Sequence, residues 1–143
     1  MSSQQKRLFG RFSVSEQQHS YRVYAALKQS GEDDPDLLAA ALLHDVGKTT
    51  MPRSWWDRPV VVLGQAFLPG KAAVWSKGDV TRFTRPFVVK ARHAGWGASL
   101  AEEAGSSAKT VALIRSHDQP PPAEMDDKWI AQLALLRWAD DRS

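Results

Sequence analysis

The sequence contains no cysteine and no long apolar run. The lack of cysteine excludes disulfides, thiolate metal sites and a cysteine nucleophile, and it fits a reducing cytoplasm. The most apolar segment, 59–69, holds 11 residues with Gly64 and Gln65 inside it. A membrane-spanning helix needs about 20 apolar residues. The first residues are polar and precede no apolar stretch of signal-peptide length. We therefore expect a cytoplasmic protein without an integral membrane segment.

Charge of one sign is not concentrated in any part of the chain. Nineteen Lys and Arg residues against 16 Asp and Glu residues give a net charge of +3, and the basic residues are spread along the sequence. Such a mild positive field favours phosphate-bearing ligands, but the sequence has no nucleic-acid-binding motif. A chain of 143 residues that is 43% hydrophobic and 24% charged has the size and composition of one soluble domain. We expect residues 1–143 to form that single domain.

Hydrophobic periodicity and capping residues predict a chain built of helices. Helices are expected at about 13–29, 37–44, 60–68, 87–92, 98–104, 107–116 and 126–141. Their expected N-caps include Ser13 or Ser15, Asp36, Ser107, and Asp126 or Asp127. Gly47 is expected to stop the second helix. The segment 60–68 begins with three valines that favour a strand locally, but its helical surroundings favour a helix. The predicted fold class is all-α, a compact bundle of six to seven helices.

Histidine is scarce and regularly spaced. The chain holds four histidines, at intervals of 25, 49 and 24 residues: His19, His44, His93 and His117. Asp45 directly follows the second histidine, and Asp140 lies 23 residues after the last one. Each of these positions is at or near the end of a predicted helix. Neutral imidazole and carboxylate are ligands that suit Zn, Fe, Mn and similar ions. Because a helical bundle can bring scattered ligands to one point in its core, we expect a central metal site.

The order His, His-Asp, His, His, Asp resembles the HD-domain superfamily of metal-dependent phosphohydrolases. The resemblance covers about residues 17–140, and Leu43-His44-Asp45-Val46-Gly47-Lys48 is similar to the His-Asp-(Ile/Val)-Gly-Lys variant of the family motif. The resemblance implies packed helices around a metal site. It further implies a core ligand set of His19, His44, Asp45 and Asp140. In two-metal members of the family Asp45 would bridge the ions, and the added ligands would be His93 and His117.

The chemistry implied by this ligand set is hydrolysis of a nucleotide or another small phosphate ester by a metal-activated water. Two divalent ions roughly 3.5–4 Å apart lower the pKa of a bound water and neutralise charge that develops on phosphate oxygens. Fe, Mn, Mg, Ni and Zn all remain candidates. We expect catalytic roles for Asp45 and Lys48, and phosphate contacts from Lys48, Arg92 and Arg115, since a lysine or arginine near a ligand can point a positive charge at the substrate.

Two other functions remain open at this stage. An HD-type di-iron oxygenase would use the same six ligands, although a phosphate-binding Lys48 argues against it. A non-catalytic module stabilised by metal is the second alternative. The Gly-Tyr-Pro phrase of one cyclic-dinucleotide phosphodiesterase branch is absent after His117, where Asp118 and a triple proline follow. The substrate of that branch is therefore not carried over, and Asp118 is interpreted as a loop residue or a neighbour of the ligands.

Tryptophan is unusually frequent, with six residues in the chain. Three of them, Trp55, Trp56 and Trp75, lie in a segment, 51–80, that separates the His-Asp pair from the third histidine and that fits no clear class. These tryptophans either pack the core or, together with nearby Lys and Arg residues, form a peripheral surface for a membrane interface or a protein partner. Both interpretations remain open.

Overall fold

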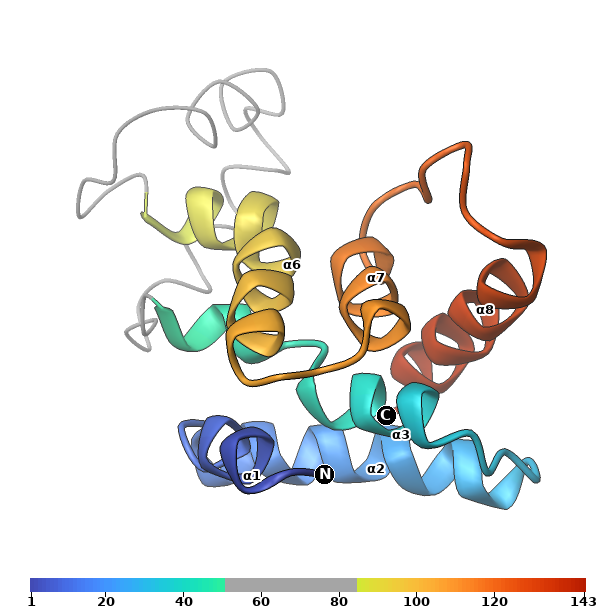
Figure 1. Ribbon diagram of the computed structural model, residues 1–143. Helices are drawn as coiled ribbons and strands as arrows, with labels where there is room; N and C mark the ends of the chain where they lie inside the picture. Colours follow the sequence, from blue (N-terminus) through green and yellow to red (C-terminus); the bar gives the residue numbers. More distant parts are fainter. Residues whose placement is uncertain (51–84) are drawn as a thin grey trace.

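The computed structural model describes residues 1–50 and 85–143, and within these ranges the chain is helical and contains no strand. The elements are α1 (Ser3–Phe9), α2 (Val14–Gln29), α3 (Pro35–Leu43), the short 3-10 helix η1 (Val46–Thr50), α6 (Arg85–Glu103), α7 (Ala108–Ser116) and α8 (Asp127–Asp141). The predicted all-α fold class is thus confirmed. Figure 1 shows α1 and α2 along one side of the bundle, with α7 between α6 and α8.

Three of the predicted helix starts are confirmed by their caps. Ser13 accepts the backbone N–H of Glu16, whose side chain reaches back to the backbone of Ser13 in a capping box. Ser107 caps α7 by accepting from the N–H of Thr110, and Asp126 caps α8. Each side-chain oxygen satisfies an N–H that has no partner inside its helix. The helix starts could therefore be predicted from local sequence.

The cap and the end of α3 differ from expectation. Asp34, and not Asp36, caps this helix, because Pro35 occupies the first helical turn, where its missing N–H costs nothing. The helix ends at Leu43 with His44 still in a right-handed conformation. Gly47 does not adopt a positive φ and lies inside η1, so it does not stop the helix as predicted. Gly31, in contrast, has a φ of 92° and follows the end of α2 as expected.

Two further helices were predicted wrongly or missed. The expected separate helices at 87–92 and 98–104 are one continuous helix, α6, because Gly95 and Gly97 are both accommodated in its interior. The short helix α1 was not expected, since its sequence is polar; a capping box between Ser2 and Gln5 starts it. The predicted helix at 60–68 and the tryptophan-rich segment 51–80 lie outside the described residues.

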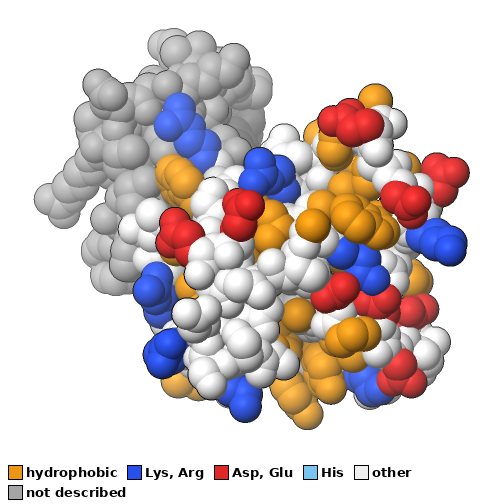
Figure 2. Space-filling model, in the orientation of Figure 1, with side chains coloured by type: hydrophobic (Ala, Val, Ile, Leu, Met, Phe, Trp, Pro, Cys, Tyr) orange, Lys and Arg blue, Asp and Glu red, His pale blue; other side chains and the backbone are white. Residues whose placement is uncertain are grey.

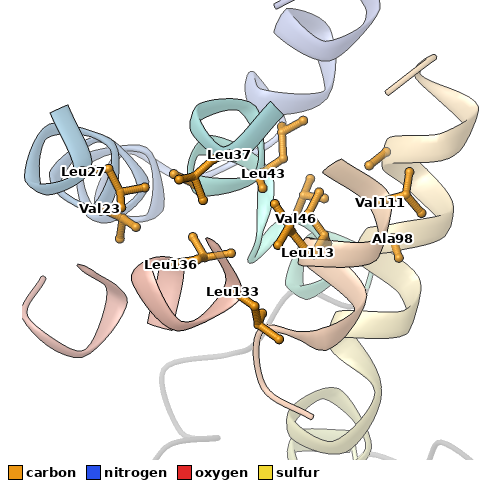
Figure 3. Packing of buried hydrophobic residues seen from close by; sticks show 14 of the residues in the cluster. Val23, Leu27, Leu37, Leu43, Val46, Ala98, Val111, Leu113, Leu133 and Leu136 are labelled. Atoms are coloured by element: carbon orange, nitrogen blue, oxygen red, sulfur yellow. The ribbon is translucent and has the colours of Figure 1, made fainter. Parts of the chain in front are cut away.

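The core explains why α3 is apolar on nearly all sides. This helix is in contact with α1, α2, α7 and α8, and a helix surrounded in this way has no face left for polar residues. Figure 3 shows Leu37 and Leu43 of α3 among side chains contributed by the neighbouring helices. Burial on this scale stabilises the fold by about 1.5–3 kcal/mol for each large aliphatic side chain. The C-terminal end of α3 is therefore held rigidly in the middle of the bundle.

The described surface carries both signs of charge. Figure 2 shows basic, acidic and apolar side chains interspersed on the face in view, without a large patch of one sign. This distribution agrees with the modest net charge of +3. None of the described helices is long and apolar enough to span a membrane.

Candidate metal centre

The centre is built around the two residues that follow the buried end of α3. His44 is fully buried and Asp45 is nearly so. The Nδ1 atom of His44 lies 2.9 Å from the carbonyl oxygen of Ala41, one turn back along the chain. A carbonyl oxygen can only accept, so Nδ1 carries a proton, and in the neutral imidazole Nε2 keeps its lone pair. That Nε2 atom is buried and has no hydrogen-bond partner.

His19 and Asp140 meet His44 on one side of the centre. Asp140 Oδ1 lies 3.0 Å from His19 Nε2 and 3.4 Å from His44 Nε2. His19 is in the middle of α2, and Asp140 is in the last turn of α8. These three residues form a group whose ligand atoms all lie within 4.8 Å of one another. The consecutive helices α2 and α3 and the distant helix α8 thus bring one donor atom each, from α2, the end of α3 and the last turn of α8, to the same point.

A second group with the same limit of 4.8 Å consists of Asp45, His93 and His117. Asp45 Oδ1 lies 3.5 Å from His93 Nε2 and 3.7 Å from His117 Nε2, and the two imidazole nitrogens are 3.2 Å apart. His117 repeats the arrangement of His44, because it follows the end of α7 and its Nδ1 donates to the carbonyl of Ile114 at 2.7 Å. His93, unlike these two, lies inside a helix, so the expectation that every histidine is near a helix end is wrong for His19 and His93.

Asp45 joins the two groups through its two carboxylate oxygens. Oδ1 faces His93 and His117, as described above. Oδ2 faces the other group, at 3.6 Å from His44 Nε2 and 3.8 Å from His19 Nε2. The carboxylate therefore stands between two separate sets of imidazoles. One oxygen of Asp45 therefore faces each of the two groups that could hold a cation.

The electrostatics of the cluster keep its carboxylates ionised. Burial opposes ionisation of Asp45, but the neighbouring imidazoles of His117 and His44 and the ammonium group of Lys48 hold its pKa well below the usual range. Burial is likewise outweighed at Asp140, where the adjacent imidazole of His44 lowers the pKa. The pKa of His93 is lowered by burial and by the charge of Lys48, which favours the neutral, ligating imidazole.

The residues present fit a site for divalent metal. The donors are four imidazoles and two carboxylates, a set that borderline ions such as Zn, Fe and Mn accept. The buried Nε2 of His44 supports this fit, because it makes no hydrogen bond and a buried polar atom without a partner is costly and rare in a folded protein. The hydrogen bonds from Nδ1 to backbone carbonyls fix the ring orientation of His44 and His117 in the way typical of metal-ligating histidines.

Of the three basic residues that the sequence suggested for substrate binding, Lys48 contacts Asp45 of the cluster directly. Its Nζ is 2.5 Å from Asp45 Oδ2, and its side chain is 24% exposed. Arg92 and Arg115 are exposed residues of α6 and α7 that lie close in sequence to His93 and His117. Neither arginine belongs to the two ligand groups, and their role in phosphate binding stays a prediction. Asp118 is also exposed and outside both groups.

Sequence reasoning missed two residues that shape this centre. An added Cβ on Gly47 would lie 1.8 Å from the carbonyl oxygen of His93, so η1 and α6 touch at this glycine. Arg137 of α8 donates to backbone carbonyls around His117. The one available signal was its spacing, since Arg137 precedes Asp140 by three residues and so shares its helix face. The contact of Gly47 had no signal in the local sequence.

Comparison with known protein families gives one match. The sequence model of the HD domain matches residues 17–141, which includes all six residues of the two ligand groups. Comparisons with curated proteins and with solved structures gave no match.

Proposed function

Because the chain belongs to the HD domain family, a superfamily of metal-dependent phosphohydrolases, we propose that it hydrolyses a nucleotide or another small phosphate ester with two divalent ions. The observation that carries this proposal is the division of the Asp45 carboxylate between two groups of ligands. His19, His44 and Asp140 would hold one ion, and His93 and His117 the other. Asp45 would serve both.

Two ions bound in this way would lower the pKa of a coordinated water and neutralise charge on the phosphate oxygens. The chain itself would hold these ions at a fixed separation through rings that are locked by backbone hydrogen bonds. The imidazoles of His44, His93 and His117 form a buried floor, whereas His19, Asp140 and Lys48 are partly exposed. A substrate would therefore enter from the side of α2, α8 and η1.

Lys48 supports a phosphate ester as the substrate. Its ammonium group stands beside the bridging carboxylate and is open to solvent in part. A compact positive charge at this place can bind a non-bridging phosphate oxygen and stabilise charge that grows in the transition state. Arg115, exposed in the last turn of α7, is the second candidate for a contact with the substrate.

The test combines metal analysis with hydrolysis of simple esters. We expect a metal-to-protein ratio near two and turnover of p-nitrophenyl phosphate or bis-p-nitrophenyl phosphate with Mn²⁺, Fe²⁺, Ni²⁺, Zn²⁺ or Mg²⁺, followed by a nucleotide panel. Asp45→Asn should lose most of the metal and more than roughly a hundredfold in rate, because loss of even the outer partners of ligands costs 10- to 100-fold. Asp141→Asn, a change of the exposed neighbour of Asp140, is the matched control. Full activity of Asp45→Asn would contradict the two-ion mechanism.

The same experiment separates the rival functions. Four imidazoles and two carboxylates also suit iron, so an iron-loaded sample that consumes oxygen and hydrolyses no ester would indicate an oxygenase. Metal that stabilises the fold without turnover of any ester or oxygen would indicate a binding module. Hydrolysis that depends on Lys48 would exclude both.

A further inference from the structure

Arg137 makes a set of hydrogen bonds that ties α8 to the turn carrying His117. Its Nε donates to the carbonyl oxygen of His117 at 3.0 Å, and its Nη2 donates to the carbonyl of Ser116 at 2.7 Å and also to that of Gln119. These carbonyls lie at the end of α7 and in the turn after it, where helical geometry leaves backbone acceptors without partners inside the helix. One guanidinium thus serves three acceptors on both sides of His117.

Hydrogen bonds therefore hold both the ring and the backbone of His117. Its ring is oriented by the bond from Nδ1 to the carbonyl of Ile114. Its backbone is held from outside α7, by a residue on another helix. If the backbone bond were absent, the residue would sit at the frayed end of a helix of nine residues, with the loop 117–126 beyond it. The position of the Nε2 atom would then depend on a flexible turn.

Arg137 also connects the two groups of ligands. It lies one turn before Asp140 on α8, and residues three apart share one face of a helix. Asp140 belongs to the group with His19 and His44, whereas His117 belongs to the group with Asp45 and His93. The guanidinium therefore fixes one group relative to the other by a route that does not pass through the Asp45 carboxylate.

We propose that Arg137 is a positioning residue that sets the place of His117 and so completes the binding site for the second ion. This inference rests on the proposed two-ion function. Lysine could not fully replace it, because a single ammonium lacks the planar fork whose donors reach several carbonyls at once. Loss of these bonds should weaken the binding of the second ion. The binding of the first ion, which His19, His44 and Asp140 would hold, should not change.

The experiment is a titration of metal-free protein with Mn²⁺, with the bound ions counted by equilibrium dialysis and elemental analysis. The samples are the wild-type chain, Arg137→Met, Arg137→Lys and Arg142→Met. The last is the matched control, because Arg142 lies at the end of the same helix and contacts the ring of Trp138. Removal of a positive charge by itself would strengthen cation binding, so weaker binding in Arg137→Met cannot come from charge.

We expect two bound ions in the wild type and in Arg142→Met. In Arg137→Met the dissociation constant of the second ion should rise roughly 10- to 100-fold, with that of the first unchanged, and Arg137→Lys should lie between this variant and the wild type. Wild-type affinity for both ions in Arg137→Met, or equal loss of both, would overturn the inference. If Arg137→Met does not fold, Arg137→Lys decides, and unchanged affinity for the second ion there overturns it.

The number of ions bound by the wild type distinguishes a failure of the two-ion function from a failure of the positioning role of Arg137. A wild-type chain that binds fewer than two ions contradicts the proposed two-ion function and this inference together. A wild type with two ions and an Arg137→Met variant that also keeps both contradicts the positioning role alone.

Discussion

Replacing Gly47 by alanine tests how closely η1 and α6 must approach for the centre to form. The Cβ atom added there would lie 1.8 Å from the carbonyl oxygen of His93, 2.7 Å from its carbonyl carbon and 2.6 Å from the backbone nitrogen of Gly97. All three atoms belong to the backbone of α6, so no side chain can rotate away. The φ angle of Gly47 is not positive. The glycine is therefore needed for space and not for its backbone conformation.

The displacement that alanine would force follows from these distances. An ordinary contact of a Cβ atom begins at 3.4 Å, so η1 and α6 would have to separate by about 1.6 Å at this point. Metal sites tolerate deviations of only about 0.2 Å in ligand distance. Asp45 directly precedes η1, and His93 is the residue of α6 that would be struck. The substitution should thus pull apart two ligands of the same group.

Gly47→Ala should lower the free energy of unfolding by at least as much as the most destabilising substitutions that overpack a core. Such substitutions typically cost about 1–3 kcal/mol, and contact with backbone atoms leaves little room for relaxation. A loss of about 3 kcal/mol would lower the melting temperature of a chain of this size by roughly 12 °C. The free energy of unfolding of a native domain is about 5–15 kcal/mol in total. The variant should therefore still fold unless the wild-type protein lies at the low end of that range.

The assay uses three glycines that form a graded series. Gly95 of α6 has open space around an added Cβ, Gly97 would meet the nitrogen of Gly47 at 3.1 Å, and Gly47 itself is the severe case. Gly95→Ala should raise the free energy of unfolding by about 0.5–1 kcal/mol, because alanine is the better helix former. Gly97→Ala should lie between the two. Thermal unfolding of metal-free protein and the bound-metal ratio are measured for each variant.

The reasoning would be refuted by a Gly47→Ala variant that matches Gly95→Ala in both measurements. Loss of stability with two metal ions still bound would also refute the link between this contact and the ligand geometry. Loss of the second ion in a folded variant is the expected result.

Three other predictions concern charge and metal. Lys48→Met should lower turnover of phosphate esters while the metal-to-protein ratio stays near that of the wild type, and unchanged kinetics would contradict the assigned role. Mn²⁺ at a hundredfold excess over its dissociation constant should stabilise the fold by about 2.7 kcal/mol, measured as a rise in melting temperature that a chelator reverses. Despite the opposing effect of burial, hydrogen bonds from Lys109 and from the backbone of Leu37 lower the pKa of Asp34 from 3.8 to about 2. Because the folded value is the lower one, the stabilisation is complete above about pH 4 and is lost as the pH falls toward 2. Asp34→Asn keeps the cap and should lower the free energy of unfolding by about 1 kcal/mol or less at pH 7, since the pair of Asp34 and Lys109 is partly solvated. The variant should also lose less stability than the wild type as the pH falls from 4 to 2. The same dependence of stability on pH in both proteins would count against this ion pair.

How much of the fold could be predicted depended on how local its cause was. Caps act within three residues, so Ser13, Ser107 and Asp126 could be identified from sequence. The continuity of α6 was missed because glycine has a poor helix propensity that tertiary packing overrides. At Gly97 the absence of a side chain allows contact with Gly47 and Ile114, a reason that lies on other elements.

Residue type and order along the chain were enough to recognise the family and to single out the six residues that the fold brings into two groups. Only the tertiary structure decided how these residues divide. Consecutive histidines among them are separated by up to 49 residues, whereas local periodicity relates a residue only to neighbours within about one helical turn. The split of Asp45 between two groups, the contact of Gly47 with α6 and the bonds from Arg137 to the turn of His117 all arise from packing between helices. Packing sets distances and directions, and metal chemistry depends on both.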